Sequence, residues 1–270
     1  MNWFAKLKNR VPFFKKNSTA KPIDFIDLSE DAHTAWWGKF GVNAEQSRYA
    51  KIGQVILCID HYDQEWRIAH HHEGQEETCS KTIAAHIMQG EVSLKPVLPD
   101  RPLFIFLENT LFLPAKSSIP LYLNLPIFIR ILIGSAPLIL EEIPTEVLSD
   151  TWHGKNTISG ELGYAIKQPV IHRLEELSKD NIHAITSIHL TNQSPDNILI
   201  KELKIPVPFF TLFCDQQNRL WTEQLSITFM DPEISTTNIM KGAPKGLKEI
   251  NLLSAPRYNI KNGFISLFNP

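Results

Sequence analysis

Residues 103–133 read LFIFLENTLFLPAKSSIPLYLNLPIFIRILI, a succession of short apolar runs separated by proline, asparagine and serine. With one more run behind it, the apolar segments lie at 103–107, 111–113, 119–125, 127–133 and 138–140. Short runs at intervals of roughly 8–12 residues, divided by turn-forming residues, are typical of antiparallel sandwiches and barrels. The prolines within them favour edge positions or strand ends, because proline cannot donate a hydrogen bond to its neighbour. This stretch therefore predicts a β-rich fold.

Alternation of apolar and polar residues extends the prediction in both directions along the chain. Residues 52–59 and 65–70 predict a hairpin that turns at 60–63, and residues 158–166 alternate with Tyr164 on the inward face. Further strands are expected at 184–191, 198–205, 209–213 and 220–230, and the polar cluster at 192–197 predicts a turn.

The expected fold class is all-β, with two packed antiparallel β-sandwich-like halves and one or two short helices. Apolar residues at helical spacing predict these helices at 2–10 and 170–180. We expect residues 1–50 to form a basic amphipathic N-terminal segment and loop. Residues 51–168 are then a first β-rich half, and residues 169–270 are a second β-sandwich-like half.

Composition and charge argue against several classes of protein. The 270 residues are 43% hydrophobic and 21% charged with a net charge of −2, whereas nucleic-acid-binding proteins usually carry a basic excess. Three widely spaced cysteines are not a disulfide framework and fit a reducing compartment, so we expect a cytoplasmic protein without a secretory signal. Polar residues and prolines interrupt residues 103–140 too often for a membrane-spanning helix.

The N-terminus combines aromatic and basic residues. Trp3 and Phe4 precede Lys6, Lys8 and Arg10 within one expected helix. Such a segment can touch the inner membrane surface as a peripheral anchor, with its apolar face in the lipid and its cations at the headgroups. The alternative is a terminal helix that docks on its own domain and leaves its lysines in solvent.

Histidines and carboxylates cluster at residues 70–77. On a strand, His70 and His72 point to the same face, and Glu73 follows directly. Imidazole and carboxylate groups are good ligands for zinc or a similar divalent metal, so these three residues are candidate metal ligands. The other interpretation is a polar strand end that leads into a solvated tip, since no established metal-binding spacing follows.

The loop at 149–157 is the second candidate site. Asp150, His153 and Lys155 bring an acid, an imidazole and an ammonium group close together in sequence, next to Trp152. These four residues are candidate ligand contacts, with Asp150 and His153 as an acid/base pair and Lys155 as the holder of an anion. The structural alternative is a tight corner, anchored by Trp152 and turned by Gly154.

Several motifs in this region resemble one known family. They are Lys116-Ser117-Ser118, Leu148-Ser149-Asp150-Thr151-Trp152 with Gly154, and Gly160-Glu161-Leu162 with Tyr164-Ala165. The chain resembles the archaeal and bacterial family called domain of unknown function four hundred and thirty-two. Relatives often carry Cys at position 163, which is Gly here, and an aromatic residue in place of His153. The resemblance implies a β-rich fold over most of the chain and no reaction type.

Two hypotheses for function follow. The first is a non-enzymatic cytoplasmic binding module that interacts with a protein partner, needs no cofactor and binds no nucleic acid. It rests on the sandwich-like pattern and on the absence of nucleotide-binding and nucleophile motifs from the sequence. The alternative is a metal-dependent enzyme that uses His70 and His72.

Overall fold

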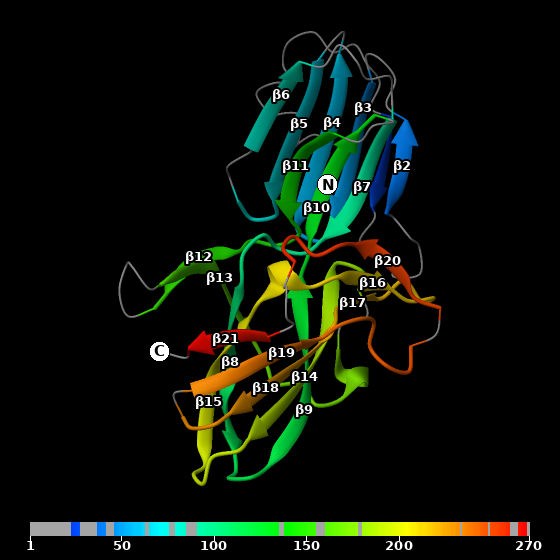
Figure 1. Ribbon diagram of the computed structural model, residues 1–270. Helices are drawn as coiled ribbons and strands as arrows, with labels where there is room; N and C mark the ends of the chain where they lie inside the picture. The colour runs from blue at the N-terminus through cyan, green and yellow to red at the C-terminus, as the bar shows by residue number, and fades with distance from the viewer. Residues whose placement is uncertain are drawn as a thin grey trace.

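The computed structural model describes residues 23–27, 37–41, 46–62, 65–75, 79–84, 91–134, 138–154, 160–177, 180–232, 234–247, 249–259 and 264–268. These residues form strands β1 to β21 and isolated turns of 3-10 helix, so the all-β prediction is confirmed. The strands build two sandwiches that are stacked end to end (Figure 1). No helix in this part of the chain has the length and apolar character that crossing a bilayer requires.

The first sandwich packs a five-stranded sheet against a four-stranded one. The five-stranded sheet contains, in order, β1 (Ile23–Asp27), β3 (Gln46–Ile52), β4 (Val55–Tyr62), β5 (Glu65–His72) and β6 (Cys79–Ala84). The other contains β11 (Leu138–Pro144), β10 (Phe128–Ile133), β7 (Glu91–Val97) and β2 (Gly38–Gly41). Alternate residues such as Leu57, Ile68 and Ile131 are almost fully buried between the two sheets and form one hydrophobic core.

The second sandwich has a larger core between two further sheets. One sheet contains β12 (Ser149–His153), β13 (Glu161–Gln168), β8 (Leu103–Leu113) and β15 (Ile198–Ile205). The other contains β20 (Asn251–Ser254), β16 (Leu212–Cys214), β17 (Leu220–Trp221), β14 (His183–Asn192), β18 (Gln224–Phe229), β19 (Ile234–Met240) and β21 (Phe264–Phe268), with β9 (Ser118–Pro126) paired to β14. Leu103, Leu123 and Leu225 are among the residues buried between them.

The sandwiches do not coincide with the expected halves 51–168 and 169–270. Strands β8, β9, β12 and β13 come from the first half but pair with each other and with β14 and β15, whereas β10 and β11 return to the first sandwich. Only Ile127 separates β9 from β10. The apolar pattern marks each run as a strand but contains no signal for the sandwich that the run joins.

Most pairings between described strands are antiparallel, as expected, and four are parallel: β1 with β3, β13 with β8, and β14 with both β17 and β18. The predicted hairpin is present as β4 and β5, although its first strand begins later than expected. Gly53 has φ of +58° and forms a separate turn between β3 and β4 instead of continuing the strand.

The helix predicted at 170–180 is wrong. The segment contains one turn of 3-10 helix, η2 (Leu174–Glu176), and Ile171 forms a β-bridge with Tyr122. Ile171 and Leu177 are buried in a cluster with Ile185, Phe213 and Trp221. The regularly spaced apolar residues therefore belong to an irregular segment that packs on a sheet. The helix predicted at 2–10 lies outside the described residues.

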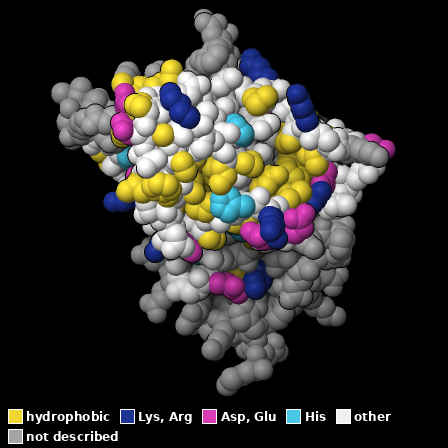
Figure 2. Space-filling model, turned by 90° about the horizontal axis from the view of Figure 1, so that it is seen from below, with side chains coloured by type: hydrophobic (Ala, Val, Ile, Leu, Met, Phe, Trp, Pro, Cys, Tyr) yellow, Lys and Arg dark blue, Asp and Glu magenta, His cyan; other side chains and the backbone are white. Residues whose placement is uncertain are grey.

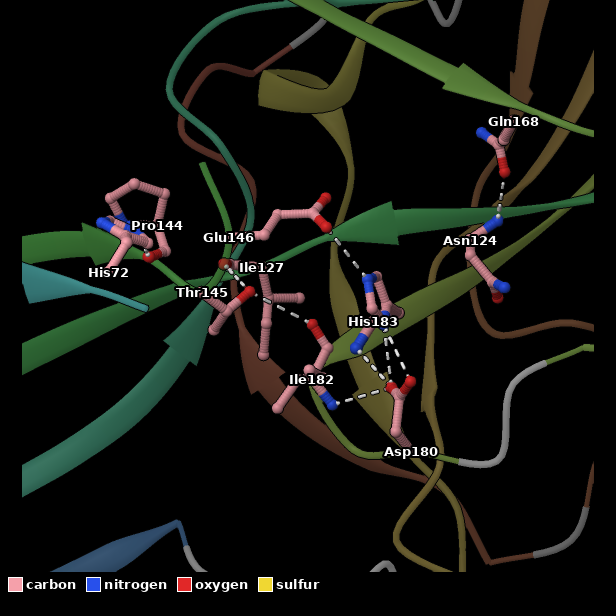
Figure 3. A network of polar contacts seen from close by, with 10 residues as sticks. All are labelled: His72, Asn124, Ile127, Pro144, Thr145, Glu146, Gln168, Asp180, Ile182 and His183. Atoms are coloured by element: carbon pink, nitrogen blue, oxygen red, sulfur yellow. Dashed lines mark hydrogen bonds and ion pairs between the residues drawn. The ribbon is translucent and has the colours of Figure 1, made fainter. Parts of the chain in front are cut away.

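A network of polar contacts joins the two sandwiches where the chain passes between them (Figure 3). The backbone N–H and the hydroxyl of Thr145 both donate to the carbonyl of Ile127, at 3.0 and 2.9 Å. Thr145 in turn accepts a hydrogen bond from the backbone of Gln54, at 3.0 Å. A Cβ atom at Gly53 would lie 2.9 Å from the Thr145 carbonyl and 2.9 Å from Ile182, so the close approach requires glycine there.

Candidate functional site

A pocket of about 480 Å³ opens on the second sandwich beside the link from β7 to β8. That link supplies Asp100, Arg101 and Pro102, and the start of β13 supplies Glu161 and Leu162. The remaining lining residues are Lys204, Pro206, Pro208, Phe209 and Tyr258. The volume lies in the range of sites that bind small molecules, and the lining combines apolar surface with a few charged groups, as such sites do.

Arg101 is held in place on one side of the pocket. Its Nη1 donates to Oδ1 of Asp150 at 3.0 Å, and its guanidinium lies over the ring of Tyr164, 5.3 Å from the centroid. The Tyr164 hydroxyl donates to Asp100 at 2.7 Å. Burial and this hydrogen bond raise the pKa of Tyr164 well above its usual value, so the phenol stays protonated and continues to donate.

A second group of charges lies beside the first. Lys204 forms an ion pair with Glu161, and both side chains line the pocket. Across β12 and β13, Glu161 is paired in register with His153. Nδ1 of His153 lies 3.0 Å from Glu202, and the imidazole stacks on Phe104 with ring centroids 4.6 Å apart. Burial raises the pKa of Glu202, while the charge of His153 opposes that effect.

Two aromatic side chains also line the pocket. The rings of Phe209 and Tyr258 are tilted against each other with centroids 5.9 Å apart, and the Tyr258 side chain is 58% exposed. The backbone N–H groups of Arg257 and Tyr258 both donate to the carbonyl of Pro208, at 2.8 and 3.1 Å. The Arg257 side chain donates to the carbonyl of Leu98 and to Glu142 of the first sandwich. These contacts fix the backbone that carries the exposed Tyr258 ring.

The expected contacts at 149–155 flank this pocket without lining it. Asp150 orients Arg101, as described above, and His153 lies on the outer face of its sheet. Trp152 is 50% exposed and packs on Gly160, where a Cβ atom would lie 2.1 Å from the indole nitrogen. Gly154 has φ of +141°, as the corner interpretation required, and Lys155 lies outside the described residues.

Two of the three candidate metal ligands, His72 and Glu73, are engaged by other groups of the protein. The rings of His70 and His72 are 6.4 Å apart on one face of β5. Nε2 of His72 lies 2.9 Å from the carbonyl of Pro144 and must donate to it, which leaves only Nδ1 as a ligand atom (Figure 3). Glu73 forms an ion pair with Lys51 at 3.1 Å. Burial, with smaller effects of His72 and His71, lowers the pKa of His70 to about 4. The described residues contain no group of three or more ligands arranged for a metal.

An unexpected ionic cluster lies at the junction of the sandwiches, around His183 (Figure 3). Nδ1 of His183 lies 3.0 Å from each carboxylate oxygen of Asp180, and Nε2 lies 3.6 Å from Glu146. Burial opposes the charged form, but hydrogen bonds to Asp180 and Glu146 prevail and raise the pKa of His183 to about 9. The imidazolium therefore ties the start of β14 to the link between β11 and β12.

Hydrophobic side chains are also exposed away from the pocket. Viewed from below, the second sandwich shows a band of them with charged groups at its margins (Figure 2). Phe112 and Leu199, which are paired in register on β8 and β15, are 55% and 62% exposed. The pocket differs from this exposed surface because it is a cavity whose lining contains ion-paired charges and an aromatic ring on a fixed backbone.

Comparison with known proteins identifies the family. The family model described as protein of unknown function (DUF432) matches residues 36–268. The chain belongs to the DUF432 family. No curated protein and no solved structure matches this DUF432 chain. The family assignment confirms the resemblance carried by the motifs between Lys116 and Ala165, and it assigns no activity.

Sequence reasoning missed most of the pocket. Arg101, Lys204, Phe209 and Tyr258 come from four separate segments, and none of them belongs to a recognisable motif. The one local signal was the family motif at 149–165. It contains Glu161 and Leu162, which line the pocket, and Asp150, which binds Arg101.

Proposed function

We propose that this DUF432 protein is a non-enzymatic binding module of the cytoplasm whose binding site is the pocket between Arg101, Leu162 and Tyr258. The observation that carries the proposal is the combination of paired charges and an exposed aromatic ring on a fixed backbone in one cavity of small-molecule size. A partner protein could insert a side chain into the same cavity. The three cysteines are free, and Cys79 is exposed, which suits a reducing compartment.

The lining chemistry favours binding over catalysis. The described residues that line the pocket include no serine, threonine, cysteine or histidine. The carboxylates that could serve as acid or base are already engaged, because Asp100 accepts a hydrogen bond from Tyr164 and Glu161 is paired with Lys204. The cations Arg101 and Lys204 are engaged by Asp150 and Glu161 in ion pairs. Contact with a membrane through Trp3 and Phe4 stays a prediction, because these residues lie outside the described part of the chain.

A fragment screen tests the proposal. Ligand-observed NMR would compare the wild-type protein with Leu162→Trp, which places a large ring in the pocket from a position that is 40% exposed. Leu252→Trp is the matched control, since Leu252 is 63% exposed and does not line the pocket. We expect hits that bind the wild type and Leu252→Trp but not Leu162→Trp. Hits that bind all three proteins equally, or a screen without hits, would refute the pocket as the binding site.

The metal-dependent enzyme is the second candidate, favoured by the neighbouring rings of His70 and His72. Elemental analysis of untagged protein separates the two functions. Stoichiometric zinc that disappears in His70→Ala would support the enzyme, whereas the binding module predicts no stoichiometric metal, because His72 and Glu73 are engaged elsewhere.

A further inference from the structure

We propose that the pocket takes a neutral, polyhydroxylated ring, the chemistry of a sugar residue; this inference rests on the proposed function. The first observation is charge balance. Two acids, Asp100 and Glu161, and two bases, Arg101 and Lys204, line the pocket, so their formal charges cancel. A pocket of this composition offers donors and acceptors together without an overall preference for an anion or a cation.

The second observation is the state of these charges. Arg101 is bound to Asp150 at 3.0 Å and lies 3.8 Å from Asp100, while Lys204 is paired with Glu161. A charged ligand would have to compete with one of these partners for its counter-charge, which reduces the gain from binding. A hydroxyl group both donates and accepts, so it can bind at the margin of an existing ion pair without breaking it. Several hydroxyls on one ring can therefore bind at the ion pairs of Arg101 and Lys204.

The third observation is the aromatic wall. A sugar ring has an apolar face of C–H groups, and such faces pack on aromatic rings through dispersion and burial. Tyr258 is the most exposed aromatic side chain of the pocket, and its backbone is fixed by Pro208 while Arg257 is anchored to Leu98 and Glu142. Because the backbone of Tyr258 is already fixed, only the side-chain torsions have to be ordered on binding, which limits the entropic cost of association.

An extended peptide fits these observations less well. Aromatic and proline-rich grooves do bind peptides, and Pro206 and Pro208 line this pocket. A basic peptide, however, would need free carboxylates, and an acidic one would need free cations, whereas these groups are already paired. Selective binding of charged peptides is therefore an outcome that contradicts the inference.

The test is saturation-transfer NMR with named probes. They are glucose, galactose, mannose, N-acetylglucosamine, maltose and cellobiose, with citrate, spermidine, and short lysine-rich and glutamate-rich peptides as charged comparators. We expect at least one sugar to bind the wild type and Leu252→Trp but not Leu162→Trp. Tyr258→Ala should weaken this binding about tenfold, equivalent to about 1.4 kcal/mol, whereas Tyr258→Phe should keep it within roughly threefold. Its affinity should change little with salt, because no net charge is neutralised.

Three results would overturn the inference. One is binding of charged probes alone, with strong salt dependence. Another is sugar binding that survives Leu162→Trp. The last is no binding of any of these sugars at about 10 mM, a concentration that detects very weak complexes. If neutral or charged fragments still occupy the pocket in the screen described above, only the sugar inference fails; if nothing occupies it, the binding-module proposal fails as well.

Discussion

Arg101 in the link between the sandwiches donates to Asp150 on β12 across 3.0 Å and thereby connects the most specific sequence motif of the chain to its pocket. The Asp150 side chain is 65% exposed, so the pair is a surface ion pair. Such pairs contribute less than about 1 kcal/mol to stability. We expect Asp150→Asn to lower the free energy of unfolding by less than that amount in urea titrations, while weakening pocket ligands through a looser Arg101. A loss above about 2 kcal/mol would show a structural role instead.

Gly163 gives a sharper prediction for stability. A Cβ atom there would lie 2.4 Å from the Pro102 carbonyl and 2.5 Å from the Phe104 ring. Because one of these neighbours is backbone, Gly163→Ala must shift the chain, and overpacking of this kind costs about 1–3 kcal/mol. Gly38→Ala is the matched control, since no atom of the described residues lies within 4 Å of its Cβ position, and its effect should stay within about 0.5 kcal/mol. Equal stability of the two variants in thermal or urea unfolding would contradict the packing at Gly163.

His183 predicts loss of stability at high pH. Its folded pKa of about 9 exceeds its ordinary value of 6.5, so its contribution is complete below about pH 6.5 and is lost as the pH rises through about 9. We expect His183→Asn to destabilise the protein by on the order of 2 kcal/mol at pH 6, and by much less at pH 10. His189→Asn, on the same strand β14, serves as the control. An NMR titration that places the His183 pKa below 7 would refute the ionic cluster.

His70 predicts the opposite trend in acid. Its folded pKa of about 4 lies below its ordinary value of 6.5, so protonation favours the unfolded chain. Stability should therefore fall as the pH drops from about 6.5 toward 4, by up to ~1 kcal/mol per pH unit. We expect His70→Leu to reduce this acid sensitivity strongly, and His71→Leu, whose side chain points to the other face of β5 and has only a minor effect on the pKa of His70, to reduce it much less. Identical acid unfolding of wild type and His70→Leu would contradict the half-buried position of His70.

The positions of many strands could be predicted from the sequence, but the strands with which they pair could not. Alternation predicted β4, β5 and β13 because a half-buried strand places every second residue in the core. The helix prediction for 170–180 was wrong because Ile171 and Leu177 pack on the outside of a sheet. Their spacing in the sequence is the same as on one face of a helix. By the same alternation Leu162 shares the face of Tyr164, but it is 40% exposed because it lines the pocket at the start of β13.

The candidate site was predictable only where it was local. Asp150 and Gly154 stood out because acidic and glycine residues at a corner are unusual in a strand-rich region. Tyr258 and Lys204 could not be found, because what gives them a role is a contact with a distant segment. Tyr258 contacts Phe209, 49 residues away, and Lys204 pairs with Glu161, 43 residues away, and no local pattern encodes such contacts. His72 was misleading, since an imidazole that joins the two sheets of the first sandwich through Pro144 has the same sequence signature as a metal ligand.

The most direct test of the binding module is an amide chemical-shift map of the protein with its best pocket ligand. If the pocket is the binding site, the largest shifts fall on the backbone amides of Arg101, Leu162 and Tyr258, which line one cavity from three separate segments. These shifts should vanish in Leu162→Trp while the rest of the spectrum is retained. Shifts confined to His70 and His72, or centred on the exposed pair Phe112 and Leu199, would contradict it.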